Sequence, residues 1–255
     1  MYQIDAFTDK VFTGNPAAVC PLDEWLDDEM MQHIAQENNL AETAFFVRNK
    51  DEYQIRWFTP TKEVDLCGHA TLASAYVIFK HLDKTIDTIK FTSTSGPLYV
   101  NQENGKIALD FPSIPPVDCK MPAYLTQALG SEPDNIMSCN NYLAVFASEK
   151  QIADISPDFS LLCKLDLQGV IITAPGKNED FVSRYFAPKY GIPEDPVTGS
   201  AHCTLIPYWA ERLNKTHLTA KQISRRSGKL FCTDLGDRVK IAGYAVEYLS
   251  GNIEV

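Results

Sequence analysis

The chain has 255 residues, of which 45% are apolar and 22% charged, so the composition excludes wholesale disorder and fits one large domain or two smaller ones. The formal charge of −10 argues against a nucleic-acid partner or an acidic membrane, because phosphate binding needs a basic surface. No apolar run approaches the roughly 18 residues of a membrane span. The seven scattered cysteines and the absence of a signal-peptide pattern predict reduced thiols in a cytoplasmic protein.

The first predicted helix covers residues 26–39. Asp27 has the position of an N-cap, and Leu26 and Met31 have the spacing of a hydrophobic staple. An apolar stripe runs along one face of this segment. We therefore expect a surface helix that packs on a sheet and carries no chemistry.

A strand, a buried helix and a set of further strands follow. Residues 54–59, "QIRWFT", have the aromatic and β-branched character of a strand. Residues 69–82, "HATLASAYVIFKHL", are apolar almost all round, which predicts a buried helix. Among the strands that follow it, Asn104-Gly105 is a hairpin signal. The Pro-rich residues 111–122 are the predicted linker to the rest of the chain.

The second half of the sequence repeats words of the first half in the same order, about 130 residues later. The matches are "RWFTP" at 56–60 with "RYFAP" at 184–188, "GHA" at 68–70 with "GSA" at 199–201, and "SGPLYV" at 95–100 with "SGKLFC" at 227–232. Three ordered matches indicate a duplication, whereas one alone would fit coincidence between strand words.

The predicted fold class is α+β, with two pseudo-symmetric halves, each a mostly antiparallel, barrel-like sheet around a central helix. The halves are expected at residues 1–113 and 114–255, and whether the last strand returns to the first half stays open. In the second central helix, near residues 200–213, Pro207 predicts a kink or a late helix start.

Two facing halves would enclose a cleft, where ligands commonly bind. Gly68 and Gly199 each stand just before a central helix, where free N–H groups and the helix dipole favour a carboxylate. This arrangement would let an acidic protein hold a small anionic metabolite. The alternative for each glycine is a tight strand-to-helix turn. The duplication favours binding.

A difference between the halves points to an acid or base. A shift of about 126 residues, inferred from the repeat, sets Glu42 against Gln168. A carboxyl between "NLA" and "TAFF" is expected to be partly desolvated, which would raise its pKa toward neutrality. The alternative is an exposed glutamate at the start of a strand.

Each of the remaining candidate residues has several possible roles. His69 is a general acid, a donor to substrate or a helix residue without a role; Asp195 orients its loop or polarises substrate; Ser200 caps a helix or donates to an oxygen. His202 is interpreted as structural. Cys67 stands two residues before His69 and is a candidate thiol nucleophile, but no cysteine-hydrolase motif surrounds it. Neither half has a zinc spacing or a nucleotide-binding glycine motif, so we expect no metal and no nucleotide cofactor.

Four segments together resemble the PhzF-like family of phenazine-biosynthesis isomerases. They are "DAFTDKVFTGNPAAVC" at 5–20, "NLAETAFF" at 39–46, "RWFTPTKEVDLCGHAT" at 56–71 and "DPVTGSAHC" at 195–203. The resemblance implies a fold similar to diaminopimelate epimerase, a site between the halves, a cofactor-free proton shift and a homodimer. It implies Glu42 as the catalytic acid/base, with His69 and Asp195, and substrate binding at Gly68, Gly199 and Ser200.

One departure separates this chain from the epimerases, which use two opposed cysteines. Cys67 precedes the first glycine, but "VTGS" at 197–200 has no thiol. We therefore expect a cofactor-independent isomerase in which Glu42 removes a proton from one carbon of a small carboxylate-bearing metabolite and returns it to another. The alternatives are an epimerase or racemase of an amino-acid-like substrate, and a non-catalytic small-molecule binding protein.

Overall fold

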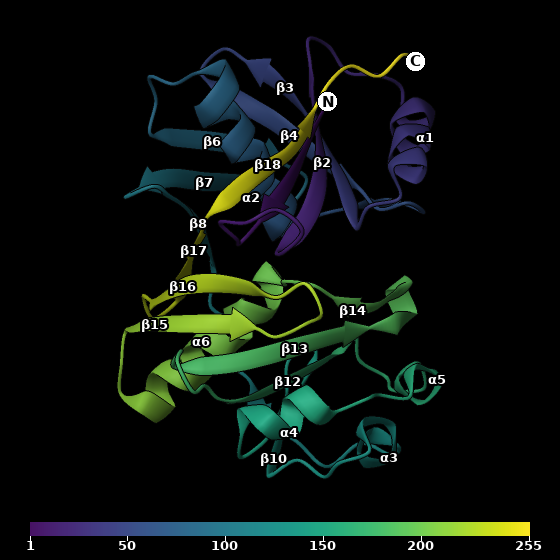
Figure 1. Ribbon diagram of the computed structural model, residues 1–255, viewed down its shortest axis with the longest axis vertical. Helices are drawn as coiled ribbons and strands as arrows, with labels where there is room; N and C mark the ends of the chain where they lie inside the picture. The colour runs from purple at the N-terminus through teal and green to yellow at the C-terminus, as the bar shows by residue number, and fades with distance from the viewer. The chain divides into compact units, whose positions relative to one another are not determined.

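A computed structural model describes the whole chain, Met1–Val255. The chain forms two compact units, which Figure 1 shows in the colours of the chain from purple to yellow. Unit 1 comprises Met1–Phe111 and Lys240–Val255, and unit 2 comprises Pro112–Val239. None of the helices combines the length and the apolar character that crossing a membrane requires.

Unit 1 opens with a strand pair, carries two helices and takes back the end of the chain. Its elements are β1 (Tyr2–Ala6), β2 (Asn15–Leu22), α1 (Asp28–Asn38), β3 (Glu42–Asn49), β4 (Glu52–Phe58), β5 (Glu63–Val64), α2 (Gly68–Val77), the π-helical turn η1 (Ile78–Leu82), β6 (Thr88–Ser93), β7 (Gly96–Glu103), β8 (Lys106–Pro112), β17 (Arg238–Gly243) and β18 (Ala245–Ser250). β18 pairs antiparallel with β1, so the C-terminal strand completes the sheet of the first half.

Unit 2 has more short helices on its outside. Its elements are β9 (Val117–Asp118), α3 (Leu125–Leu129), β10 (Asn135–Ser138), β11 (Tyr142–Val145), α4 (Glu149–Asp154), α5 (Phe159–Leu162), β12 (Val170–Pro175), β13 (Phe181–Ala187), the 3₁₀ turn η2 (Pro188–Tyr190), β14 (Ile192–Asp195), α6 (Gly199–Leu213), β15 (His217–Gln222) and β16 (Gly228–Asp234).

The strand pairing is the same in both units, which confirms the duplication. In unit 1, β2 pairs parallel with β3, β3 antiparallel with β4, β4 parallel with β6, and β6 antiparallel with β7. In unit 2, β11, β12, β13, β15 and β16 follow the same sequence of parallel and antiparallel pairings. The fold is α+β, as expected, and its sheet combines parallel with antiparallel pairs.

Each unit wraps its strands around one buried helix, also as expected. Nearly every residue of α2 is buried, and the helix packs against β1, β2, β3 and β18. α6 is buried over most of its length and packs against β15 and β16 (Figure 1). A helix enclosed by a sheet needs apolar side chains on every face, which explains the uniform composition read from the sequence.

Pro207 does not delay the start of α6, which runs from Gly199 to Leu213 with the proline inside it. Proline lacks an N–H group, so the carbonyl four residues earlier, that of Cys203, loses its helical partner. The backbone N–H of Ile114 donates to this oxygen at 2.9 Å. The linker thus supplies the hydrogen bond that the proline removes.

Two local predictions are confirmed. Asp27 caps α1, and its carboxylate accepts the N–H of Met30 at 2.7 Å. Asn104 and Gly105 both have positive φ, 50° and 75°, and form the tight turn between β7 and β8. Both residue types favour such backbone angles, which is why the sequence indicated the hairpin.

Candidate functional site

The fold places Glu42 at the first position of β3. It pairs there with Ala17 of the parallel strand β2, and its side chain is 13% exposed. The turn that leads into β2 depends on Gly14, whose φ is +68° and whose added Cβ would lie 2.2 Å from the carbonyl oxygen of Ala6. A glycine at this turn therefore fixes where β2 starts next to Glu42.

His69 is the second residue of α2, and its ring is buried. Its Nε2 lies 3.2 Å from Glu42 Oε2. Two residues predicted from separate motifs thus form one constellation. A carboxylate and an imidazole at this separation can share or exchange a proton during a reaction.

The other ring nitrogen of His69 also has a polar neighbour. Asn15 Nδ2 lies 3.2 Å from Nδ1, and Cys67 Sγ lies 3.5 Å from it. Asn15 is fully buried, and sequence reasoning did not single it out. The available signal was an Asn between Gly14 and Pro16, inside the segment 5–20 that carries the family resemblance.

Burial controls the charge of this imidazole. It lowers the pKa of His69 to about 3, because a protonated ring cannot be hydrated inside the unit. At neutral pH the ring carries no charge. It is therefore an uncharged polar neighbour of Glu42 and not its counter-ion.

A second buried histidine belongs to unit 2. His202 Nδ1 donates to the carbonyl oxygen of Thr198 at 2.7 Å, and its ring lies against Phe181. Burial lowers its pKa to about 4. These contacts lie within the unit's core, in line with the structural interpretation of His202.

The two buried histidines predict a pH dependence of stability. Their pKa is lower folded than in the unfolded chain, so the unfolded chain binds more protons below pH 6.5 and stability falls as the pH drops from there toward 4. Each contributes at most about 1.4 kcal/mol per pH unit. In His202→Asn, whose amide can donate to Thr198, urea titrations should show a shallower slope. An unchanged slope would contradict the assignment of His202.

The group of Glu42, Cys67 and His69 is compact enough to be considered as a metal site. One ligand atom from each lies within 4.8 Å of the others. However, His69 turns Nε2 toward the carboxylate and Nδ1 toward the thiol. No single ring nitrogen faces both other ligands, so the arrangement fits a row of polar contacts better than a coordination sphere.

In unit 2, Asp195 is the last residue of β14, and α6 begins four residues later at Gly199. Thr198 Oγ1 donates to Asp195 Oδ2 at 2.5 Å, and the side chain of Gln222 accepts the N–H of Thr198 and donates to the carbonyl oxygen of Asp195. Gln222 is fully buried and was also missed by sequence reasoning. It fixes the turn that carries the predicted Asp195.

The starts of the two central helices have matching construction. Gly68 begins α2 and Gly199 begins α6, and neither N-cap side chain, Cys67 nor Thr198, caps the first turn. Ser200 is exposed, whereas Gly199 is buried. Uncapped first turns retain their capacity to bind an anion. The expectation that both starts face one cleft stays a prediction.

The strand register corrects the predicted counterpart of Glu42. The Phe of the repeated pentapeptide serves as a common reference in the two units. In unit 1, Phe58 pairs with Thr43, the residue after Glu42. In unit 2, Phe186 pairs with Val170, the residue after Gly169. Glu42 therefore corresponds to Gly169, and the match with Gln168 is wrong by one residue. A side chain has no room there, since a Cβ on Gly169 would lie 2.6 Å from the carbonyl oxygen of Phe186.

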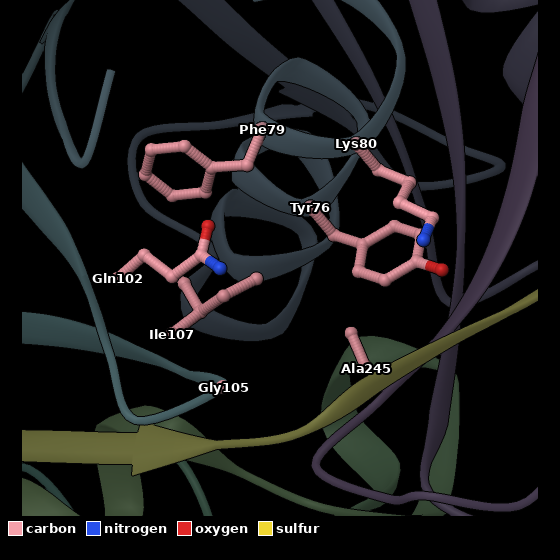
Figure 2. A pocket seen from close by; sticks show the side chains of 7 residues that line it. All are labelled: Tyr76, Phe79, Lys80, Gln102, Gly105, Ile107 and Ala245. Carbon is pink, nitrogen blue, oxygen red and sulfur yellow. The ribbon is translucent and has the colours of Figure 1, made fainter. Parts of the chain in front are cut away.

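A cavity of about 190 Å³ lies elsewhere in unit 1. Figure 2 shows the hydroxyl of Tyr76 beside the ammonium of Lys80, with Phe79 and Gln102 at the other end. None of the predicted site residues lines it. The candidate site is therefore identified by the side chains of Glu42 and His69, and not by this cavity.

Comparisons with known proteins agree with this geometry. The chain matches the family model described as "Phenazine biosynthesis-like protein", PhzC-PhzF, over residues 4–251. A Pseudomonas aeruginosa protein named as an uncharacterized isomerase is 51% identical over 255 residues, covering 100% of this chain and 98% of that protein. A crystal structure of a PhzF-family phenazine biosynthesis protein from Enterococcus faecalis superposes with a TM-score of 0.98 at 48% identity, covering 100% of this chain and 98% of that one.

A more distant structure bears on the fold alone. A hydroxyproline epimerase from Agrobacterium vitis superposes with a TM-score of 0.63 at 8% identity, over 97% of this chain and 90% of that one. The expected epimerase-like fold is thereby confirmed. The names of the sequence relatives confirm the expected enzyme class, an isomerase. The chain belongs to the phenazine biosynthesis-like, PhzC-PhzF, family.

Proposed function

We propose that this protein is a cofactor-independent isomerase that shifts a proton between carbons of a small carboxylate-bearing metabolite. The observation that carries the proposal is the Glu42 carboxyl at a strand start, mostly buried and 3.2 Å from an uncharged His69. A carboxylate withdrawn from water is a stronger base than one in solution, and a carbon acid needs such a base.

Glu42 is assigned both proton transfers. Its carboxylate removes a proton from one carbon, electrons move through the adjacent double bond, and the carboxylic acid so formed returns the proton to another carbon on the same face. Atoms and charge balance without an added group. His69, whose Nε2 lies 3.2 Å from the carboxylate, is assigned to hold Glu42 in position for both transfers.

The substrate's own carboxylate is assigned to the helix starts. Gly68, Gly199 and Ser200 belong to first turns whose N-cap side chains leave the N–H groups uncapped. Asp195, fixed by Thr198, is assigned to a polar or positively charged group of the substrate. This division suits an anionic metabolite that also carries a hydroxyl or amino group.

Racemisation by two thiols is the second candidate. Cys67 lies near the site, which favours it, but the N-cap of α6 is Thr198, and a hydroxyl is a far weaker base than a thiolate. A protein that only binds its ligand is the third candidate. One experiment separates all three.

The test is deuterium incorporation from D₂O into a panel of small cyclic carboxylic and amino acids, followed by ¹H NMR. The proposal expects exchange at a carbon-bound position with the wild type and with Cys67→Ser, and formation of a positional isomer. Loss of exchange in Cys67→Ser, with inversion at a single carbon, would favour the racemase. Saturable binding across the panel with no exchange would favour the binding protein and overturn the proposal.

A further inference from the structure

We propose that Asn15 is a positioning residue that sets the tautomer of His69 and thereby keeps Glu42 available as an ionised base. The effect on Glu42 as a base rests on the proposed function. The tautomer of His69, that is, which ring nitrogen carries the proton, does not depend on it. It extends the site beyond the residues that the sequence identified.

The first step is the direction of the hydrogen bond. The Asn15 amide nitrogen can only donate, and it lies 3.2 Å from His69 Nδ1. Nδ1 must therefore accept through its lone pair. A neutral imidazole with an accepting Nδ1 carries its proton on Nε2, the nitrogen 3.2 Å from Glu42 Oε2.

The second step links this proton to the charge of Glu42. An N–H group next to a carboxylate stabilises its ionised form. If Nδ1 carried the proton instead, a bare nitrogen lone pair would face the carboxyl, and Glu42 would have to be protonated to satisfy it. The amide of Asn15 thus acts through the ring on the protonation state of the base.

The third step is that the amide cannot readily turn away. Asn15 is fully buried at the start of β2, where it pairs with Ala6 of β1, and Gly14 fixes the preceding turn. Water cannot take over the role of the amide at a fully buried position. The tautomer is therefore set by the protein rather than by solvent.

The chain contains a natural reference for this effect. His202 is also buried and uncharged, but its Nδ1 faces the carbonyl oxygen of Thr198, which can only accept. Its proton must therefore be on Nδ1. The two buried histidines are expected to be opposite tautomers in the same molecule.

Long-range ¹⁵N–¹H correlation NMR of histidine-labelled protein tests the inference, with His69→Gln and His202→Asn spectra for assignment. At pH 7 the wild type should show His69 as the Nε2–H form and His202 as the Nδ1–H form. In Asn15→Asp, whose carboxylate only accepts, His69 should become Nδ1–H or doubly protonated, while His202 stays unchanged. The variant Asn101→Asp, at a partly exposed position of β7, is the matched control and should change neither ring.

Two results would overturn the inference: an Nδ1–H form of His69 in the wild type, or an Nε2–H form that persists in folded Asn15→Asp. The wild-type spectrum decides even if the variant fails to fold. With a substrate in hand, Asn15→Asp should lose on the order of 10²-fold in exchange rate. The NMR readout needs no substrate, so failure of the proposed isomerase reaction and failure of the tautomer assignment remain distinguishable.

Discussion

Replacing Glu42 by Gln is expected to lower the deuterium-exchange rate by about 10²- to 10⁴-fold, the range that a positioned acid/base contributes. Glutamine keeps the size of the side chain and an oxygen that can lie next to His69 Nε2, which is 3.2 Å from the carboxylate in the wild type. It cannot take up a proton from carbon at neutral pH. The loss should therefore appear in turnover rather than in substrate binding.

The same variant should remain folded. A change of amide for carboxylate at a side chain with 13% exposure alters no packing volume, so the urea midpoint should move by less than the equivalent of about 1 kcal/mol. Glu103→Gln, on the exposed β7–β8 hairpin, removes a carboxylate of the same size and should keep the wild-type rate. Equal exchange in wild type and Glu42→Gln would exclude Glu42 as the base.

Replacing Trp209 by Ala is expected to cost about 3–5 kcal/mol of unfolding free energy, the range for a large aromatic removed from a core. Trp209 is 1% exposed, stacks on Phe181 with ring centroids 5.7 Å apart, and donates from Nε1 to Thr173 Oγ1 at 2.9 Å. The substitution leaves a cavity inside the sheet of unit 2. Urea denaturation followed by circular dichroism measures the loss.

Trp25 provides the matched control for this prediction. It is only partly buried beside α1, and its Nε1 donates to Gln54 Oε1 at 3.0 Å. Trp25→Ala should cost less than about 2 kcal/mol, because the side chain already contacts water in the folded protein. If both tryptophan variants lost the same free energy, α6 would not be the centre of the unit 2 core.

Sequence reasoning succeeded where a local signal has one structural meaning. The repeated pentapeptide indicates the duplication. The two segments that are apolar all round indicate the central helices, because a helix inside a sheet must be apolar on all sides. Asp27 and Asn104-Gly105 mark a helix start and a hairpin because few residue types satisfy those backbone positions. It was less successful with Pro207, since the partner of the freed Cys203 carbonyl is Ile114, a residue distant in the chain.

By itself, the sequence determined the α+β class, the two duplicated halves, the family and the candidate status of Glu42, His69 and Asp195. These depend on composition, periodicity and motif order, which are properties of the chain in one dimension. Only the tertiary structure decided that Glu42 corresponds to Gly169, that Asn15 contacts His69, and that Gln222 fixes the Asp195 turn. The reason is physical: strand register and buried hydrogen bonds join residues far apart in sequence, and no local pattern records which partner each buried polar group finds.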